Sequence, residues 1–396
     1  MKNFLDLKLW LAIAGCLSLK AAERPSGPWN LDAPKAAPKV TWGARTGLVQ
    51  QVWYEGEPFQ GKPTRVFAYY SRPAEGQAPF PAMVLVHGGG GKAFAEWATL
   101  WAERGYAALA MDLSGRGPDG QRLPDGGPEQ DDVGKFRNFA GTEAREMWTY
   151  HAVAAALRGH SLLAAQKEVD PSRIGITGIS WGGYLTCIVA GLDDRLKVAV
   201  PVYGCGFIHE SSVWVDSRFA KMKPEQRERW AQYFDPSQYL PGVRCPILFV
   251  NGTTDFAYPL DSYQKSYRLV PAGADLCVQV GLKHGHKEGW SIPEIGLYVD
   301  SVLKGGTPLP KVGRMETWEG NARLTFRSQT PVTKAQLHYT TDSGPWPKRT
   351  WESLGAFVIG TTAQAPLPSE RPLVCFMTVT DGRGAVVSTE HVVLER

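Results

Sequence analysis

The sequence has little of what marks nucleic-acid-binding, metal-binding or repeat proteins. Its 396 residues carry a formal net charge of only +4, and the basic residues are dispersed along the chain, so we do not expect a nucleic-acid partner. No fixed-period repeat or low-complexity tract is present. The cysteines after residue 16 are isolated and lack the C-x-x-C spacing of a zinc site, which predicts small buried side chains and leaves a single disulfide of undetermined pairing open. They are Cys187, Cys205, Cys245, Cys277 and Cys375.

The N-terminus has the order of an export signal. Lys2 and Lys8 flank the charged start, residues 9–19 are almost wholly apolar, and small residues at 20–23 offer a cleavage site. The apolar stretch is too short to span a membrane. We therefore predict a signal peptide over residues 1–22 and an exported protein. The sequence Ile-Ala-Gly-Cys ending at Cys16 also resembles a lipobox, so a lipid anchor to the cell envelope stays open beside soluble export, as does a buried N-terminal helix.

The order of the expected elements indicates one large domain followed by a small one. Residues 23–60 are rich in Pro, Gly and Trp and are expected to form an irregular N-terminal arm. Over residues 61–305, apolar strand-like runs alternate with helical segments, which predicts an α/β fold with a mostly parallel sheet flanked by helices. The Gly- and Pro-rich stretch 304–310 marks a boundary. Short β-branched runs predict a small antiparallel β-sandwich over residues 311–396.

The most informative motif is Gly178-Ile179-Ser180-Trp181-Gly182, between an expected strand and an expected helix. This is the pattern of a nucleophile elbow. The glycines permit a turn so tight that the serine hydroxyl projects from the sheet. The start of the following helix directs backbone N–H groups toward a nearby oxyanion. The pattern predicts Ser180 as a nucleophile.

A serine hydroxyl needs a base to become nucleophilic, and the base needs an acid to orient it. Asp255 follows the expected strand 246–250, and His284 and His286 follow the expected strand 276–280. Catalytic groups gather at the carboxyl ends of strands in open α/β sheets. We predict Asp255 as the acid and His284 as the base. His286 stays open as an alternative base or a side chain that lines the site, and a capping role for Asp255 also stays open.

A glycine run, His87 to Gly91, directly follows the expected strand 82–86. Such a turn lets backbone N–H groups approach an oxyanion, and we predict Gly89 and Trp181 as the two donors. His87 is expected to support this loop rather than act as a base. The run lacks the G-K-[ST] of a phosphate loop, and the pair His284-x-His286 lacks a further ligand cluster. We expect neither a metal nor a cofactor.

With these residues in place, the chain resembles the α/β-hydrolase superfamily over roughly residues 60–305. It looks most like the branch of acetyl xylan esterases, dienelactone hydrolases and the catalytic domains of prolyl oligopeptidases. The stretch 284–290, His-Gly-His-Lys-Glu-Gly-Trp, looks more like the secreted acetyl xylan esterase type. Peptidase relatives carry a β-propeller before the hydrolase domain, and only about 60 residues precede this one.

The resemblance implies a cofactor-free serine esterase that acts on an acetylated carbohydrate or a similar small-molecule ester. A serine peptidase on the same scaffold and a catalytically inactive glycan-binding relative are the alternatives. In the C-terminal module, Trp346 and Trp351 are candidates for glycan contact, against a packing role. The segments 113–139 and 206–240 are expected to shape the pocket. The sequence leaves the oligomeric state undetermined.

Overall fold

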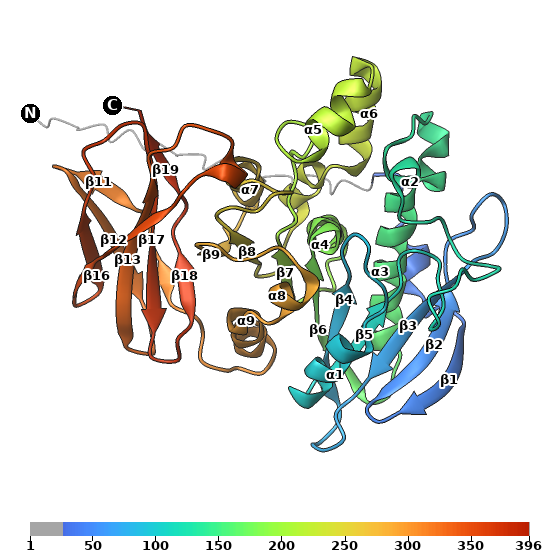
Figure 1. Ribbon diagram of the computed structural model, residues 1–396. Coiled ribbons are helices and arrows are strands. Elements are labelled where there is room, and N and C mark those ends of the chain that lie inside the picture. Colours follow the sequence, from blue (N-terminus) through green and yellow to red (C-terminus); the bar gives the residue numbers. More distant parts are fainter. Residues whose placement is uncertain (1–26, 396) are drawn as a thin grey trace, which may run out of the picture.

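The computed structural model describes residues 27–395, which form a large α/β domain and a C-terminal β module (Figure 1). The predicted signal peptide, residues 1–22, and Cys16 lie outside the described residues. Within residues 27–395, no helix has the length and apolar character needed to cross a bilayer.

A nine-stranded sheet forms the centre of the α/β domain, in the order β1-β2-β3-β5-β4-β6-β7-β8-β9. The pairs from β1 to β5 are antiparallel, and those from β5 to β9 are parallel. β4, β5, β7 and β8 are buried along their whole length, as in a parallel sheet covered on both faces. The predicted fold class is confirmed. The strands are β1 Val40–Thr46, β2 Val49–Glu55, β3 Arg65–Ser71, β4 Phe80–Val86, β5 Ala107–Met111, β6 Val169–Ile179, β7 Val198–Val202, β8 Leu248–Gly252 and β9 Asp275–Gln279.

Five longer helices pack against this sheet. α3 and α4 contact each other and β6, while α1 and α9 border a common crevice. The stretch 141–164 begins as a 3₁₀ turn, Gly141–Glu146, and continues as α3. Met147, in extended conformation, separates the two. The helices are α1 Ala95–Glu103, α3 Trp148–Ala164, α4 Trp181–Leu192, α7 Leu260–Tyr267 and α9 Pro293–Leu303.

The prediction of an irregular arm over residues 23–60 is wrong for residues 40–55. β1 and β2 form an antiparallel hairpin that extends the sheet beyond β3. β1 is an exposed edge strand with a register irregularity between Trp42 and Arg45, so it lacks the apolar alternation by which strands are recognised. Residues 27–39 do lack a strand, and Trp29 fixes them to α3 through a 2.9 Å hydrogen bond from its indole nitrogen to the carbonyl of Tyr150.

Two insertions stand above the carboxyl end of the sheet and form a cap, defined here as α2 Asp132–Phe136, α5 Trp214–Ser217 and α6 Pro224–Phe234 (Figure 1). An ion pair joins Arg218 to Asp132. The indole of Trp230 donates a 2.8 Å hydrogen bond to the carbonyl of Lys135, and Arg229 donates to the carbonyl of Phe139. The two segments expected to shape the pocket are therefore fastened to each other.

The C-terminal module consists of two five-stranded antiparallel sheets. One has the order β10-β12-β16-β15, with β11 beside β12; the other has the order β14-β13-β17-β18, with β19 beside β17. Alternate residues of β12 are buried, as in a sandwich. The strands are β10 Lys311–Val312, β11 Glu316–Trp318, β12 Asn321–Arg327, β13 Val332–Thr340, β14 Glu352–Gly355, β15 Phe357–Ile359, β16 Thr362–Pro366, β17 Leu373–Asp381, β18 Val386–Ser388 and β19 Val392–Leu394.

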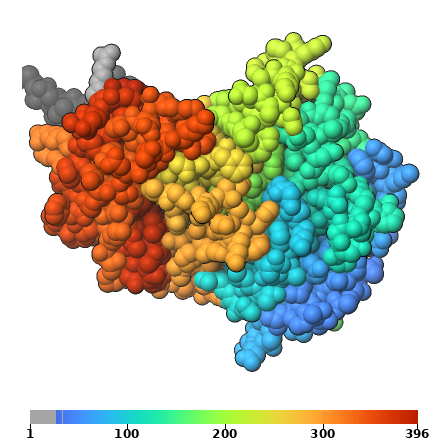
Figure 2. Space-filling view, viewed as in Figure 1, coloured from blue at the N-terminus to red at the C-terminus, as the bar shows by residue number. Residues whose placement is uncertain are grey.

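The C-terminal module lies against the free edge of the large sheet. β18 runs beside β9, where the Val278 N–H donates to the Ser388 hydroxyl over 2.9 Å. The buried carboxylate of Glu294 in α9 accepts a 2.7 Å hydrogen bond from the Val386 N–H. In the space-filling view the C-terminal module touches the large domain, and the cap stands apart from the module (Figure 2). The module therefore covers an edge that would otherwise expose unpaired backbone groups.

Trp346 and Trp351, the two candidates for glycan contact, lie at this junction. Both are half-buried and pack against an apolar cluster made by Leu260, Val278 and Phe376. The cluster joins α7, β9 and β17, so the position of the two indoles favours the packing role.

Candidate active site

Ser180 occupies the sharp turn between β6 and α4. Its backbone has φ 59° and ψ −119°, a conformation that non-glycine residues adopt at strained functional turns. A Cβ on Gly182 would fall inside the carbonyl of Val86, and one on Gly178 would fall inside the carbonyl of Gly182. The two glycines are therefore required by close backbone approach, as the motif predicts.

Asp255 and His284 are joined by a 2.6 Å hydrogen bond between Oδ2 and Nδ1. The other carboxylate oxygen, Oδ1, accepts from the N–H groups of Ala257 and Tyr258 over 2.9 and 2.8 Å. The carboxyl group is buried, and these bonds fix its orientation. The imidazole stacks on the ring of Tyr203 at a centroid distance of 4.3 Å. With Nδ1 bound to Asp255, the Nε2 atom of His284 is left for a proton transfer.

Tyr258 lies beside this pair. Its ring lies nearly parallel to the His284 imidazole, 6.4 Å away between centroids, and its hydroxyl comes near the Ser180 side chain. The phenol is fully buried, and its hydroxyl has no hydrogen-bond partner within residues 27–395. Burial raises the pKa of Tyr258 well above its ordinary value. Sequence reasoning missed this residue, because an isolated tyrosine after a strand looks like any core aromatic.

The glycine loop after β4 contacts the elbow. A Cβ on Gly89 would lie 3.0 Å from the indole Cδ1 of Trp181, so the two predicted oxyanion donors are neighbours. The Gly89 N–H makes no hydrogen bond within the described part of the chain. Trp181 is the first residue of α4, where backbone N–H groups lack an intrahelical acceptor. Both N–H groups are therefore free to bind an anion.

His286 takes a different position from His284. Its Nε2 atom accepts a 2.9 Å hydrogen bond from the N–H of Gly88. His87 contacts the carbonyl of the same residue, with Nδ1 2.7 Å from the Gly88 oxygen. The structure thus pairs Asp255 with His284 and places His286 against the glycine loop. His151 and His160 lie in α3.

Trp181 forms an aromatic wall beside the elbow. Its indole contacts four rings, and the Nζ atom of Lys135 lies 5.2 Å from its centroid. Lys135 is buried and donates to the carbonyl of Gln130 over 3.1 Å; burial lowers the pKa of its ammonium. The rings belong to Phe136, Trp148, Tyr184 and Trp214. Because α2 and α5 supply some of these contacts, the cap shapes this side of the site.

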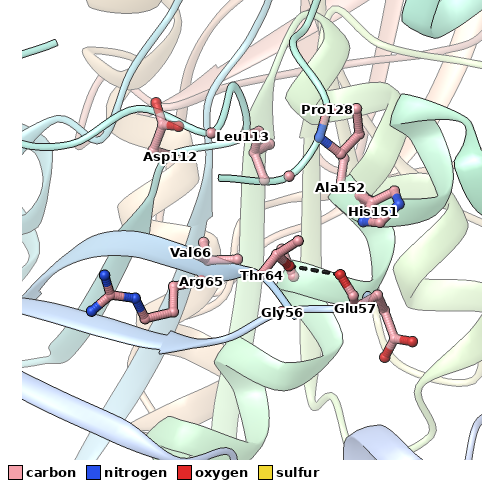
Figure 3. Close-up of a pocket in the computed structure, with 13 residues that line it drawn as sticks. Gly56, Glu57, Thr64, Arg65, Val66, Asp112, Leu113, Pro128, His151 and Ala152 are labelled. Carbon is pink, nitrogen blue, oxygen red and sulfur yellow. Dashed lines mark hydrogen bonds between the residues drawn. The ribbon is translucent and has the colours of Figure 1, made fainter. Parts of the chain in front are cut away.

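A separate cavity lies between β3, the end of β5 and α3 (Figure 3). It is small, with a volume of about 30 Å³. The Thr64 hydroxyl donates to the Glu57 carbonyl over 2.6 Å on its wall, and Asp112 and His151 also line it. None of the predicted catalytic residues does. Among residues 27–395, no group of three His, Cys, Asp or Glu side chains is placed to hold a metal ion.

Comparison with known proteins agrees with this geometry. The acetyl xylan esterase (AXE1) family model matches residues 39–213. An acetyl xylan esterase from Paenibacillus sp. R4 has a similar structure, with a TM-score of 0.56 and 23% identity over 69% of this chain and 92% of that chain. The chain has the α/β-hydrolase fold.

Two curated relatives carry names of different activities. Acetyl esterase Axe7A of Xylanibacter ruminicola is 21% identical over 221 residues, 52% of this chain and 49% of the relative. The uncharacterized peptidase YuxL of Bacillus subtilis is 25% identical over 221 residues, 51% of this chain and 30% of the relative. The chain thus spans less than half the length of either.

Proposed function

We propose that this α/β-hydrolase cleaves carboxylic esters through a Ser180–His284–Asp255 triad. The observation that carries the proposal is the 2.6 Å bond between Asp255 and His284, at the same edge of the sheet as the strained Ser180. A histidine oriented by a buried carboxylate, together with a serine at a strained turn, supports a triad of nucleophile, base and orienting acid.

In the proposed reaction the Ser180 hydroxyl attacks the ester carbonyl while Nε2 of His284 takes its proton. The N–H groups of Gly89 and Trp181 bind the oxyanion that forms. When the intermediate collapses, the alcohol leaves with the proton from His284, and an acyl-enzyme remains. A water molecule then attacks the acyl group as His284 takes its proton, the acid is released, and the proton returns to Ser180. No cofactor takes part.

The substrate we propose is an acetyl ester on a carbohydrate, from a xylan-type polysaccharide or a smaller acetylated sugar. The match to the acetyl xylan esterase family and the similarity to an acetyl esterase support this class. We propose that the aromatic rings around Trp181 restrict the acyl group to a short one. A peptidase is the second candidate, because the curated relative YuxL carries that description.

We also propose that the protein is exported. The support is the apolar stretch 9–19 with its flanking lysines and small residues. Mass spectrometry of the mature N-terminus tests it: a start near residue 23 supports soluble export, a lipidated Cys16 supports an anchor, and an intact Met1 in the exported fraction overturns both.

An ester panel on wild-type protein and a Ser180→Ala variant tests the catalytic proposal. The panel contains p-nitrophenyl acetate, longer p-nitrophenyl esters, acetylated xylan, a feruloyl ester and an aminoacyl amide. We expect turnover of the acetyl esters by the wild type and none by Ser180→Ala at an unchanged melting temperature. Labelling of Ser180 by a fluorophosphonate checks the nucleophile directly. Activity that survives in Ser180→Ala rejects the triad, and a preference for the amide favours the peptidase.

A further inference from the structure

Two histidines hold Gly88, the residue that precedes the proposed oxyanion donor Gly89. His286 accepts a hydrogen bond from the N–H of Gly88, and His87 contacts its carbonyl oxygen. We propose that His286 and His87 are positioning residues that clamp Gly88 and thereby fix the N–H of Gly89 in the oxyanion site. This inference rests on the proposed function and deepens it.

The hydrogen bonds define which nitrogen of each imidazole carries the proton. Nε2 of His87 accepts a 2.9 Å hydrogen bond from the Leu113 N–H, so its proton is on Nδ1, which donates to the Gly88 carbonyl. Nε2 of His286 accepts from the Gly88 N–H, so its proton is also on Nδ1. Each imidazole can accept its backbone N–H hydrogen bond only when it is neutral, because both nitrogens of a protonated ring are donors. Burial, the largest cause, lowers the pKa of both imidazoles to about 4.

The surroundings leave His286 little freedom. Its ring lies 4.9 Å from the ring of Phe94 and 6.5 Å from that of Trp290 between centroids. On the loop side, a Cβ on Gly91 would lie 2.8 Å from Nε2 of His286, and one on Gly88 would lie 3.1 Å from it. The glycines of the loop therefore serve this contact as well as the oxyanion. The imidazole fits against a backbone that has no side chains in the way.

The clamp also determines which N–H group of the loop can bind the oxyanion. The Gly88 N–H is engaged by His286, while the Gly89 N–H is free within the described residues. His286 is unsuited to be the triad base, because its Nε2 atom is occupied and Asp255 is bound to His284. One histidine of the H-x-H pair thus transfers the proton and the other holds the oxyanion loop.

Substitutions of His286 test the clamp. His286→Leu removes the acceptor, and His286→Gln keeps an acceptor oxygen near the position of Nε2. We expect His286→Leu to lower kcat for p-nitrophenyl acetate about 10–100-fold, somewhat less than the loss of an oxyanion donor itself, with KM changed less than about threefold. His286→Gln is expected to recover at least part of kcat. Should the leucine variant fail to fold, His286→Ala measured with and without added imidazole replaces it.

His338→Leu is the matched control. His338 is also buried, has its pKa lowered to about 4 mainly by burial, and bonds Ser353 and Thr378 in the C-terminal module. We expect this variant to lose stability but to keep kcat. Wild-type kcat in folded His286→Leu, or an equal loss in His338→Leu, overturns the clamp.

Fluorophosphonate labelling separates this proposal from the proposed function. If the wild type is labelled at Ser180 but hydrolyses no acetyl ester, the substrate class is wrong and the labelling rates of the same variants decide the clamp. If the wild type hydrolyses the ester and His286→Leu matches it, only the clamp is wrong. If the wild type is neither labelled nor active, both fail.

Discussion

Oδ2 of Asp255 lies 2.6 Å from Nδ1 of His284, and the other oxygen of the same carboxylate is held by two backbone N–H groups. These three hydrogen bonds fix the orientation of the pair. One orients the imidazole of His284, and two hold the carboxylate of Asp255 on the loop after β8. The pair is therefore rigid before any substrate binds, which is the condition for an effective base.

Asp255→Asn is expected to lower kcat about 10⁴-fold, because an amide donor would favour the wrong imidazole tautomer. The side-chain oxygen of asparagine can still accept from the N–H groups of Ala257 and Tyr258, so we expect a folded protein. Steady-state kinetics with p-nitrophenyl acetate and a thermal melt measure the two effects. Asp193→Asn is a control, since Asp193 is a buried carboxylate that pairs with Arg195. Near-normal turnover by Asp255→Asn would argue against the triad.

Tyr258→Phe is expected to reduce activity while the protein becomes no less stable. The hydroxyl is buried near Ser180 without a hydrogen-bond partner among residues 27–395; burying such a group costs about 1–3 kcal/mol. A polar group kept at that cost beside a nucleophile indicates a role with substrate bound. We expect kcat/KM to fall up to about tenfold and the free energy of unfolding to stay equal or rise. A variant with full activity would leave the hydroxyl without a catalytic role.

Gly182→Ala is expected to abolish activity and to destabilise the protein by several kcal/mol. The added methyl group would overlap the carbonyl of Val86, so β4 or the elbow has to move, and strain of this kind belongs to the largest single-residue effects. Denaturant unfolding and ester hydrolysis report the two losses. Gly344→Ala provides the comparison, since nothing lies within 4 Å of a Cβ there and no change is expected. A stable, active Gly182→Ala protein would contradict the geometry of the elbow.

The parts that could be predicted from the sequence are those with local chemical causes. The elbow follows from glycines that backbone contact requires, and the buried strands follow from unbroken apolar runs. The sequence favours His284 as the base but leaves His286 open, since two histidines one residue apart differ only in how the loop after β9 directs each ring. Tyr258 was missed because β7 separates β8 from β6 in the sheet, and nothing local to this tyrosine indicates that it comes near the turn after β6. β1 was missed because an exposed edge strand carries no alternation.

The last prediction concerns acid stability. Burial, in each case the largest cause, lowers the pKa of six histidines to about 4, whereas an unfolded chain has values near 6.5. Between these pH values the unfolded chain binds protons that the folded chain does not, so stability falls as the pH drops from 6.5 toward 4. Each histidine contributes a slope of up to about 1.4 kcal/mol per pH unit. They are His87, His151, His160, His286, His338 and His391.

Urea unfolding at pH 7, 6 and 5 measures this slope, and His391→Gln isolates one contribution. His391 is buried in the C-terminal module, and its carbonyl accepts from Gln264 of the large domain. Glutamine preserves that backbone contact and does not titrate. We expect the variant to lose less stability than the wild type between pH 7 and pH 5, by up to about 2 kcal/mol. Parallel stability curves for the two proteins would mean that His391 titrates alike in the folded and unfolded chains, and burial would then not govern its acid response.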